Sequence, residues 1–152
     1  MINISALLPD LSISQNSFYL IKEFNKCLSD TDLSMGVFHL RAALPPIQPL
    51  FSCKNVAFLN SYNGVIVSTR IEEANITLKS YCKTDRYLYL WDLDWLENPV
   101  HFSTAMETMR DPKLKLIARS ESHAEVIKNF CNREVCGIVD NWSMGQLLEI
   151  VK

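Results

Sequence analysis

Apolar runs of strand length alternate with amphipathic helical patterns along most of this 152-residue chain. Because strand–helix–strand units fold back with one handedness, this alternation predicts a mostly parallel β-sheet flanked by helices on both faces. No linker, repeat or low-complexity segment divides the sequence, so we expect one α/β domain over residues 1–152. The strands expected to carry it are Ile2–Leu8, Met35–Leu40, Arg86–Trp91, Leu114–Ala118 and Val135–Val139.

Capping residues mark the expected helix starts. Ser14 is suited to cap an amphipathic helix over Gln15–Leu28. Later helix starts are predicted from capping boxes, in which a Ser or Thr and a Glu or Gln three positions later satisfy free backbone amides. These boxes are Thr69–Glu72, Thr104–Glu107, Ser122–Glu125 and Ser143–Gln146.

The middle of the chain is less regular. Arg41–Lys54 contains three prolines and is predicted to be a surface loop or a lid, because proline fixes φ and removes an amide donor. Two short apolar runs follow, Asn55–Asn60 and Gly64–Ser68, with Asn63 and Gly64 at their junction. Since Asn and Gly tolerate positive φ, this junction favours a tight turn and a local antiparallel strand pair.

Composition excludes several classes of protein. The net charge of −2 and pI of about 5.9, without a basic stripe, argue against a nucleic-acid partner. No apolar run approaches the roughly 18 residues of a membrane-spanning helix. The five cysteines form no C-x-x-C pair, which predicts reduced thiols in a cytoplasmic protein and no zinc site. We expect no cofactor, because neither a G-x-G-x-x-G fingerprint nor a P-loop motif occurs.

Ligand binding is expected at the carboxyl ends of the strands, where the loops of a parallel sheet collect. Thr69 and Arg70 follow one expected strand at this edge. Two aspartates at Trp91–Trp95 could hold a divalent cation, but a lone carboxylate pair supplies too few ligands, so no metal site is predicted. Arg119 suits a phosphate or carboxylate, and the alternative is a structural pairing with Asp92 or Asp140. The predicted ligand-binding residues are Asp10, Gln15, Asp92, Asp94, Arg119, Ser120 and His123, and no catalytic residue is identified.

Two segments, Ile4–Asp10 and Leu116–His123 ahead of Val135–Val139, resemble the N-terminal Rossmann-like domain of GT-B glycosyltransferases. Tyr87–Leu96 also resembles short uncharacterised proteins of marine cyanobacterial phages. The first resemblance implies a Rossmann-like fold that binds a nucleotide, sugar or acceptor at the carboxyl edge. The chain departs from that family because Ser14–Asn16 stands where glycines are usual.

The resemblance leaves two functional hypotheses. GT-B enzymes take most nucleotide-sugar contacts from a second Rossmann domain, so a single copy implies an incomplete donor site. A partner chain or a homodimer would then complete it. The alternative is a non-catalytic module that binds a host or phage protein, in the host cytoplasm if the chain is phage-encoded. Rossmann-like folds host many functions, so the fold alone does not decide between them.

Overall fold

The expected fold class is confirmed. The computed structural model describes the backbone of residues 1–152 and every side chain except that of Asp94. One seven-stranded sheet runs in the order β3-β2-β1-β4-β5-β6-β7, and all of its strand pairs are parallel. This is a Rossmann-like strand order extended by one strand at the β6 side. The strands are β1 (Ile2–Leu8), β2 (Leu33–His39), β3 (Ser52–Asn55), β4 (Asn63–Ser68), β5 (Lys83–Tyr89), β6 (Leu114–Ala118) and β7 (Gly137–Ile138).

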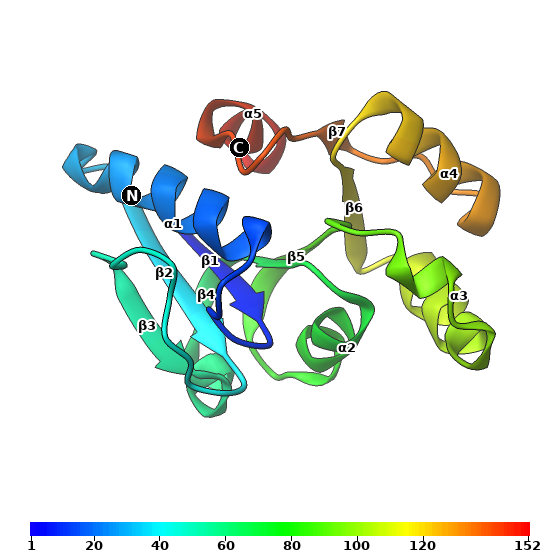
Figure 1. Ribbon diagram of the computed structural model, residues 1–152, viewed down its shortest axis with the longest axis horizontal. Helices are drawn as coiled ribbons and strands as arrows, with labels where there is room; N and C mark the ends of the chain where they lie inside the picture. Colours follow the sequence, from blue (N-terminus) through cyan, green and yellow to red (C-terminus); the bar gives the residue numbers. More distant parts are fainter.

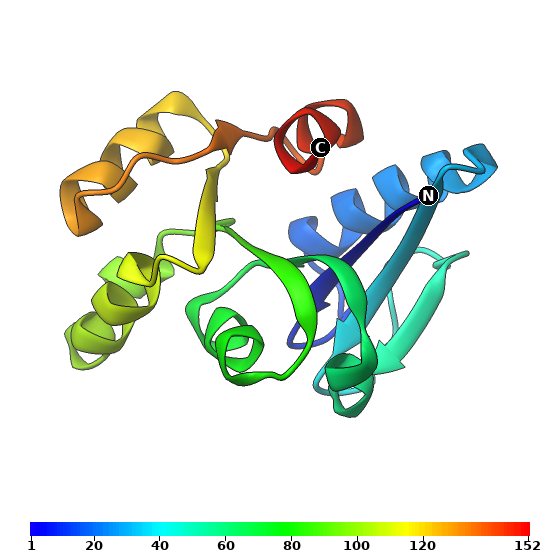
Figure 2. The ribbon, with the colours of Figure 1, turned by 180° about the vertical axis from the view of Figure 1, so that it is seen from behind.

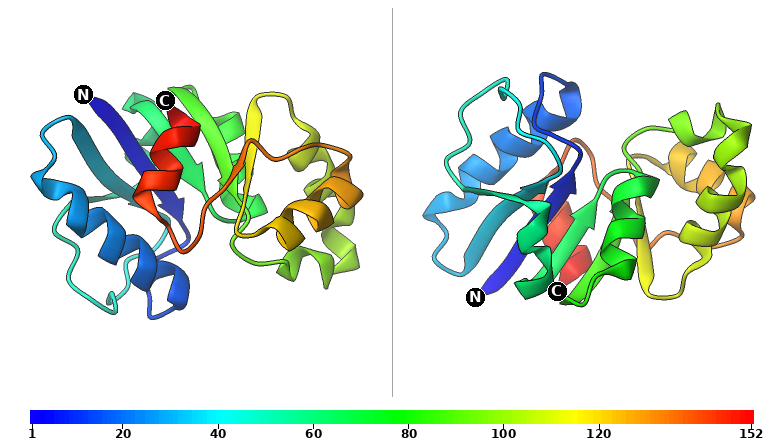
Figure 3. Two further views of the ribbon diagram at one scale, coloured as in Figure 1. Left: turned by 90° about the horizontal axis from the view of Figure 1, so that it is seen from above. Right: turned by 90° about the horizontal axis from the view of Figure 1, so that it is seen from below.

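Helices cover both faces of the sheet, as Figures 1 and 2 show from opposite sides. Two helices, α1 and α5, pack on one face, and they lie side by side in Figure 1 and in the left view of Figure 3. The other face carries α2, α3 and α4. The helices are α1 (Gln15–Lys26), α2 (Ile71–Lys79), α3 (Phe102–Arg110), α4 (Glu121–Cys131) and α5 (Met144–Val151). Short 3₁₀ turns are η1 (Cys27–Ser29), η2 (Val56–Ser61), η3 (Asp94–Leu96) and η4 (Pro99–His101).

The strands alternate their side chains between the two helical layers, because successive residues of a strand point to opposite faces. In β1, Ile4, Ala6 and Leu8 join the core beneath α1 and α5, whereas Leu7 joins a cluster on the opposite face. All four are at most 1% exposed. Both faces of this central strand are therefore buried, which is why its second half, Ala6–Leu8, is a continuous apolar run.

Trp142 anchors α5 and the β7–α5 loop to the core. Its side chain is fully buried, and its ring meets those of Phe24 and Tyr89 edge-on at centroid distances of 5.8 and 5.1 Å. The indole Nε1 donates to Asn16 Oδ1 over 2.8 Å, and the Tyr89 hydroxyl donates to the backbone oxygen of Val139 over 2.6 Å. These buried polar groups are satisfied, so they fix the position of α5 against α1.

The expected antiparallel pair in the middle of the chain is wrong. Asn55–Asn60 is not a strand: Val56–Ser61 forms the 3₁₀ turn η2, and the preceding strand β3 lies earlier, at the end of the expected loop. β4 pairs in parallel with both β1 and β5. Gly64 does have a positive φ of 147°, but its role is close approach to β1, since a Cβ there would lie 2.6 Å from the Asn3 backbone oxygen.

The Ser14 cap is confirmed, whereas three of the four capping boxes are misplaced and the fourth marks the correct N-cap without forming the box. Ser14 Oγ accepts from the Ser17 amide over 3.0 Å at the start of α1. The box at Thr69–Glu72 is displaced, because α2 has Arg70 as its N-cap and this residue makes no side-chain cap bond. The capping box is a short local motif, so it does not determine at which residue the preceding strand ends and the helix begins.

The remaining boxes have different outcomes. The box at Thr104–Glu107 lies inside α3, which begins at Phe102, and α4 is capped by Ser120, two positions before the box at Ser122–Glu125. Ser143 is the N-cap of α5 without a side-chain cap bond, and Gln146 Oε1 instead accepts from the Asp140 amide over 2.8 Å.

Candidate functional site

A cavity opens at the point in the sheet where the strand order reverses. The chain leaves β1 toward β2 on one side, and it leaves β4 toward β5 on the other. The loops after β1 and β4 therefore diverge, and such switch points are where open α/β sheets bind ligands. A cavity of about 450 Å³ lies at this point. Its wall comprises the β1–α1 connection and the first turn of α1, together with Arg41, Thr69, Arg70, Trp91 and Asp92; we call it the switch cavity.

Asp10 organises the β1–α1 connection. Its Oδ1 accepts from the backbone amide of Ser12 over 2.9 Å and from the hydroxyl of the same residue. Its Oδ2 accepts from Arg41 Nη2 over 3.3 Å, which links the loops that follow β1 and β2. The Ser12 hydrogen bonds, followed by the charges of Arg41 and Arg70, lower the pKa of Asp10 below its ordinary value. Asp10 is therefore a carboxylate at neutral pH.

The first turn of α1 faces the switch cavity. Ser14, Gln15, Asn16 and Ser17 all contribute to its wall. The first amides of any α-helix lack partners within the helix and carry partial positive charge. Ser14 Oγ satisfies the amide of Ser17. The remaining amides of this turn are suited to an anionic or polar ligand group.

Thr69 is the unusual polar group of this wall. It follows β4 directly, it is only 3% exposed, and its Oγ1 has no hydrogen-bond partner within the described part of the protein. Buried hydroxyl groups nearly always have a partner, because leaving one unpaired costs roughly 1–3 kcal/mol. The capping role predicted for Thr69 would have supplied that partner, but α2 begins without it. Thr69 therefore presents an unpaired donor and acceptor beside the N-terminus of α2.

Glu73 lies one helical turn beyond Thr69 and is also buried. It is 2% exposed, and its Oε2 has no hydrogen-bond partner among the described groups. Burial is the largest influence and raises the pKa of Glu73, while the charges of Arg70 and Arg41 act in the opposite direction. The α2 start thus holds two buried polar atoms that no described group satisfies.

Arg119 packs against Trp91, which lines the switch cavity. Its guanidinium carbon lies 3.8 Å from the ring centroid of Trp91, and its Nη1 donates to the Trp91 backbone oxygen over 3.4 Å. Nη2 donates to Asn141 Oδ1 over 3.0 Å. The structural pairing expected with Asp92 or Asp140 is wrong, since neither forms an ion pair with Arg119 among the described side chains. A flat guanidinium stacked on an indole is well stabilised without a carboxylate.

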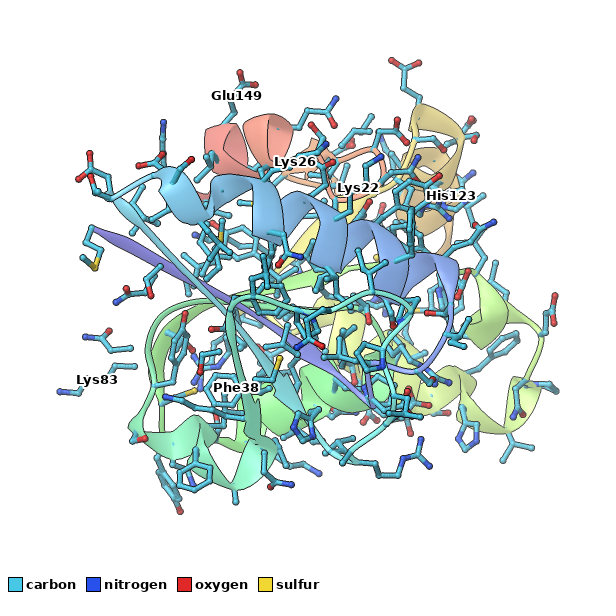
Figure 4. The ribbon with its side chains drawn as sticks, turned by 60° about the vertical axis from the view of Figure 1, so that its left-hand side comes forward. Lys22, Lys26, Phe38, Lys83, His123 and Glu149 are labelled. Carbon is cyan, nitrogen blue, oxygen red and sulfur yellow. The ribbon has the colours of Figure 1, made fainter. Side chains whose placement is uncertain are left out.

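The structure brings some predicted residues together and separates others. Asp10, Gln15 and Asp92 all line the switch cavity. Ser120 and His123 do not belong to its wall: the Ser120 hydroxyl accepts from the His123 amide over 3.2 Å and caps α4, which carries His123 in Figure 4. His123 Nδ1 is buried without a partner among the described groups. The side chain of Asp94 lies outside the described residues.

Sequence reasoning did not place Arg41 at the cavity, and it assigned Thr69 a different role. Arg41 was expected only as the first residue of a loop, and its contact with Asp10 joins residues 31 positions apart in the sequence. Thr69 was placed at the correct edge but was given a capping role. The position of Thr69 directly after an apolar strand indicates that it lies at the carboxyl edge of the sheet. This position does not indicate that its hydroxyl lacks a hydrogen-bond partner.

Comparison with known proteins adds no relative. The chain matches no family model, no curated protein and no solved structure at a significant level. Among the described residues, no three His, Cys, Asp or Glu side chains gather closely enough to hold a metal ion. No helix of the described structure is both long and apolar enough to cross a membrane. The geometry of the switch cavity is therefore the basis for inferring a function.

Proposed function

We propose that this protein binds a small phosphate-bearing sugar or nucleotide in the switch cavity. The observation that carries the proposal is the Thr69 hydroxyl, which is buried in the cavity wall without a partner among the described side chains and backbone groups. A ligand oxygen hydrogen-bonded to this hydroxyl would remove the cost of burying it unpaired.

The charges around Thr69 favour a phosphate at this end of the ligand. The N-termini of α1 and α2 both border the cavity, and Arg41 and Arg70 contribute guanidinium groups to its wall. Helix N-termini and forked guanidinium donors are suited to phosphate oxygens. Phosphate is therefore the charged group that this end of the cavity would take.

Two carboxylates in the same wall favour hydroxyl donors. Asp10 and Asp92 line the cavity, and the lowered pKa of Asp10 keeps it an acceptor at neutral pH. Carboxylates would repel a second phosphate but accept hydrogen bonds from sugar hydroxyls. A phosphorylated sugar, alone or within a nucleotide, has both kinds of group.

The opposite edge of the sheet is a poorer candidate despite a larger hollow. A hollow of about 550 Å³ is lined there by Asn3, Asn63 and Lys83, and Lys83 is labelled in Figure 4. The amino ends of parallel strands receive the C-termini of the preceding helices, whose partial charge is negative. The helix dipoles therefore favour a phosphate at the carboxyl edge.

A thermal-shift panel tests the proposal. The panel holds inorganic phosphate, ribose 5-phosphate, glucose 6-phosphate, the nucleoside 5′-monophosphates and UDP-glucose, each with and without Mg²⁺. A ligand present at about 100 times its Kd stabilises the folded state by about 2.7 kcal/mol, which raises Tm by several degrees in a chain of this size.

Two threonine variants connect any stabilisation to the cavity. Thr69→Val should abolish or sharply reduce the shift. Thr77→Val is the matched control, because Thr77 is fully buried on α2 and its hydroxyl already donates to the Ala74 backbone oxygen over 2.8 Å. If no phosphate compound raises Tm, or if the shift survives in Thr69→Val, the proposal fails.

A further inference from the structure

We infer that the ligand is a nucleotide whose base lies in a second cavity beside the switch cavity; this rests on the proposed function. The second cavity has a volume of about 260 Å³ and lies between α2, the η3–η4 segment and the start of α3. We call it the α2–α3 cavity. Its wall includes Arg70, Ile71, Asn75, Trp95 and Thr104.

The two cavities are adjacent because the same two loops build both of them. In the β4–α2 connection, Thr69 lines the switch cavity, Ile71 lines the α2–α3 cavity, and Arg70 between them lines both. In the segment after β5, Asp92 lines the first cavity and Trp95 lines the second. A ligand with its phosphate beside Thr69 therefore has the α2–α3 cavity within reach across Arg70.

The α2–α3 cavity differs chemically from the switch cavity. Ile71, Trp95 and Ala105 give it apolar surface. The Trp95 ring is held in place from two directions, by a hydrogen bond from Nε1 to the Asp92 backbone oxygen over 3.2 Å and by the Phe130 ring at a centroid distance of 4.5 Å. Trp95 is 8% exposed, so the part of its fixed indole that reaches the cavity, with its aliphatic neighbours, offers an apolar contact to a planar heterocycle.

Two amide side chains add polar groups to the same wall. The Thr108 hydroxyl lies 3.0 Å from Asn75 Oδ1 and 2.7 Å from the Thr104 backbone oxygen, so its single hydrogen is shared between these two acceptors, and Asn98 Oδ1 accepts from the Val100 amide over 3.2 Å. These contacts occupy the oxygens, and neither amide nitrogen has a partner among the described hydrogen bonds. Asn75 and Asn98 thus supply donors, which match the carbonyl and ring-nitrogen acceptors of a nucleobase. A plain sugar phosphate would leave both the donors and the apolar surface unused.

Calorimetric titration of the wild-type protein with ribose 5-phosphate and with the four nucleoside 5′-monophosphates tests this inference. Stacking and burial of a base predict that the best nucleotide binds at least about tenfold more tightly than ribose 5-phosphate. Thr104→Phe fills the α2–α3 cavity from an exposed position on α3 and should reduce this affinity ratio to about one. Ser103→Phe is the matched control, since it adds the same ring at the neighbouring exposed position outside that cavity wall and should keep the ratio.

The outcomes separate this inference from the proposed function. A ratio near one in the wild type, or a ratio that survives in a folded Thr104→Phe, overturns the base site while the phosphate site stands. If ribose 5-phosphate and all the nucleotides fail to bind, the proposed function itself is wrong. A melting curve checks that each variant is folded, and Thr104→Leu replaces Thr104→Phe if the latter is not.

Discussion

Replacing Thr69 with valine should stabilise the unliganded protein, which is the opposite of the usual effect of changing a buried residue. Thr69 is 3% exposed and its hydroxyl has no partner within the described structure, so the wild type bears the cost of an unpaired buried group. That cost is roughly 1–3 kcal/mol, and valine removes it with almost no change of shape. Even at the low end, the gain of about 1 kcal/mol corresponds to a rise in Tm of about 2–4 °C for a domain of this size.

The same substitution at Thr77 should have the opposite sign. Thr77 is fully buried, but its hydroxyl donates to the Ala74 backbone oxygen, so Thr77→Val loses a hydrogen bond and should cost about 1 kcal/mol. Urea denaturation in phosphate-free buffer measures both variants against the wild type, because a bound phosphate would mask the effect. If Thr69→Val and Thr77→Val lose stability equally, the Thr69 hydroxyl is satisfied in the free protein and the reasoning is refuted.

Three other predictions concern charge, stacking and backbone geometry. Burial raises the pKa of Glu73 in the folded protein, so ionisation of this carboxyl lowers the free energy of unfolding as the pH rises through that raised pKa. Glu73→Gln should therefore have a higher Tm than the wild type at pH 7, and the difference in Tm should vanish below the ordinary glutamate pKa. Arg119→Ala removes the stack on Trp91 and the hydrogen bonds of the guanidinium, so the free energy of unfolding measured in urea should fall by roughly 1–2 kcal/mol while phosphate binding persists. Lost phosphate binding with unchanged stability would instead assign Arg119 to the ligand. Gly64→Ala should destabilise the protein by more than about 1 kcal/mol, because the added Cβ would collide with Asn3. Gly145→Ala in α5 should stabilise the protein by about 0.5–1 kcal/mol, because the space around the added Cβ is open. Equal effects of the two substitutions would contradict the close approach of β1 and β4.

The strands that are buried on both faces could be predicted from sequence. The expected strands Ile2–Leu8 and Leu114–Ala118 coincide with β1 and β6, since most of their residues are apolar and buried, and Lys115 is the exposed exception in β6. β3 gave no such signal, because all four of its residues are exposed at the edge of the sheet. The adjacent run at Asn55–Asn60 is apolar because Leu59 packs from a 3₁₀ turn onto the core, and periodicity cannot separate these cases over so few residues.

The location of the site could be predicted better than its chemistry. The order and direction of the strands place Asp10, Gln15 and Asp92 at one cavity. A parallel sheet, as predicted from the sequence, is sufficient to expect this grouping. The contact of Arg41 with Asp10 depends on the path of a proline-containing loop, which local sequence does not specify. The unpaired state of Thr69 depends on α2 starting one residue later than its capping box implies, and only the three-dimensional structure determines that boundary.

The proposed function requires that a phosphate-bearing ligand binds at the switch between β1 and β4. Titration of ¹⁵N-labelled protein with ribose 5-phosphate, followed by two-dimensional NMR of the backbone amides, tests the location without changing any residue. The account predicts that the largest shifts occur at the first turns of α1 and α2, including the amides of Gln15, Asn16 and Ile71. Shifts concentrated at the amino edge, around Asn63 and Lys83, or no saturable shift at all, would contradict it.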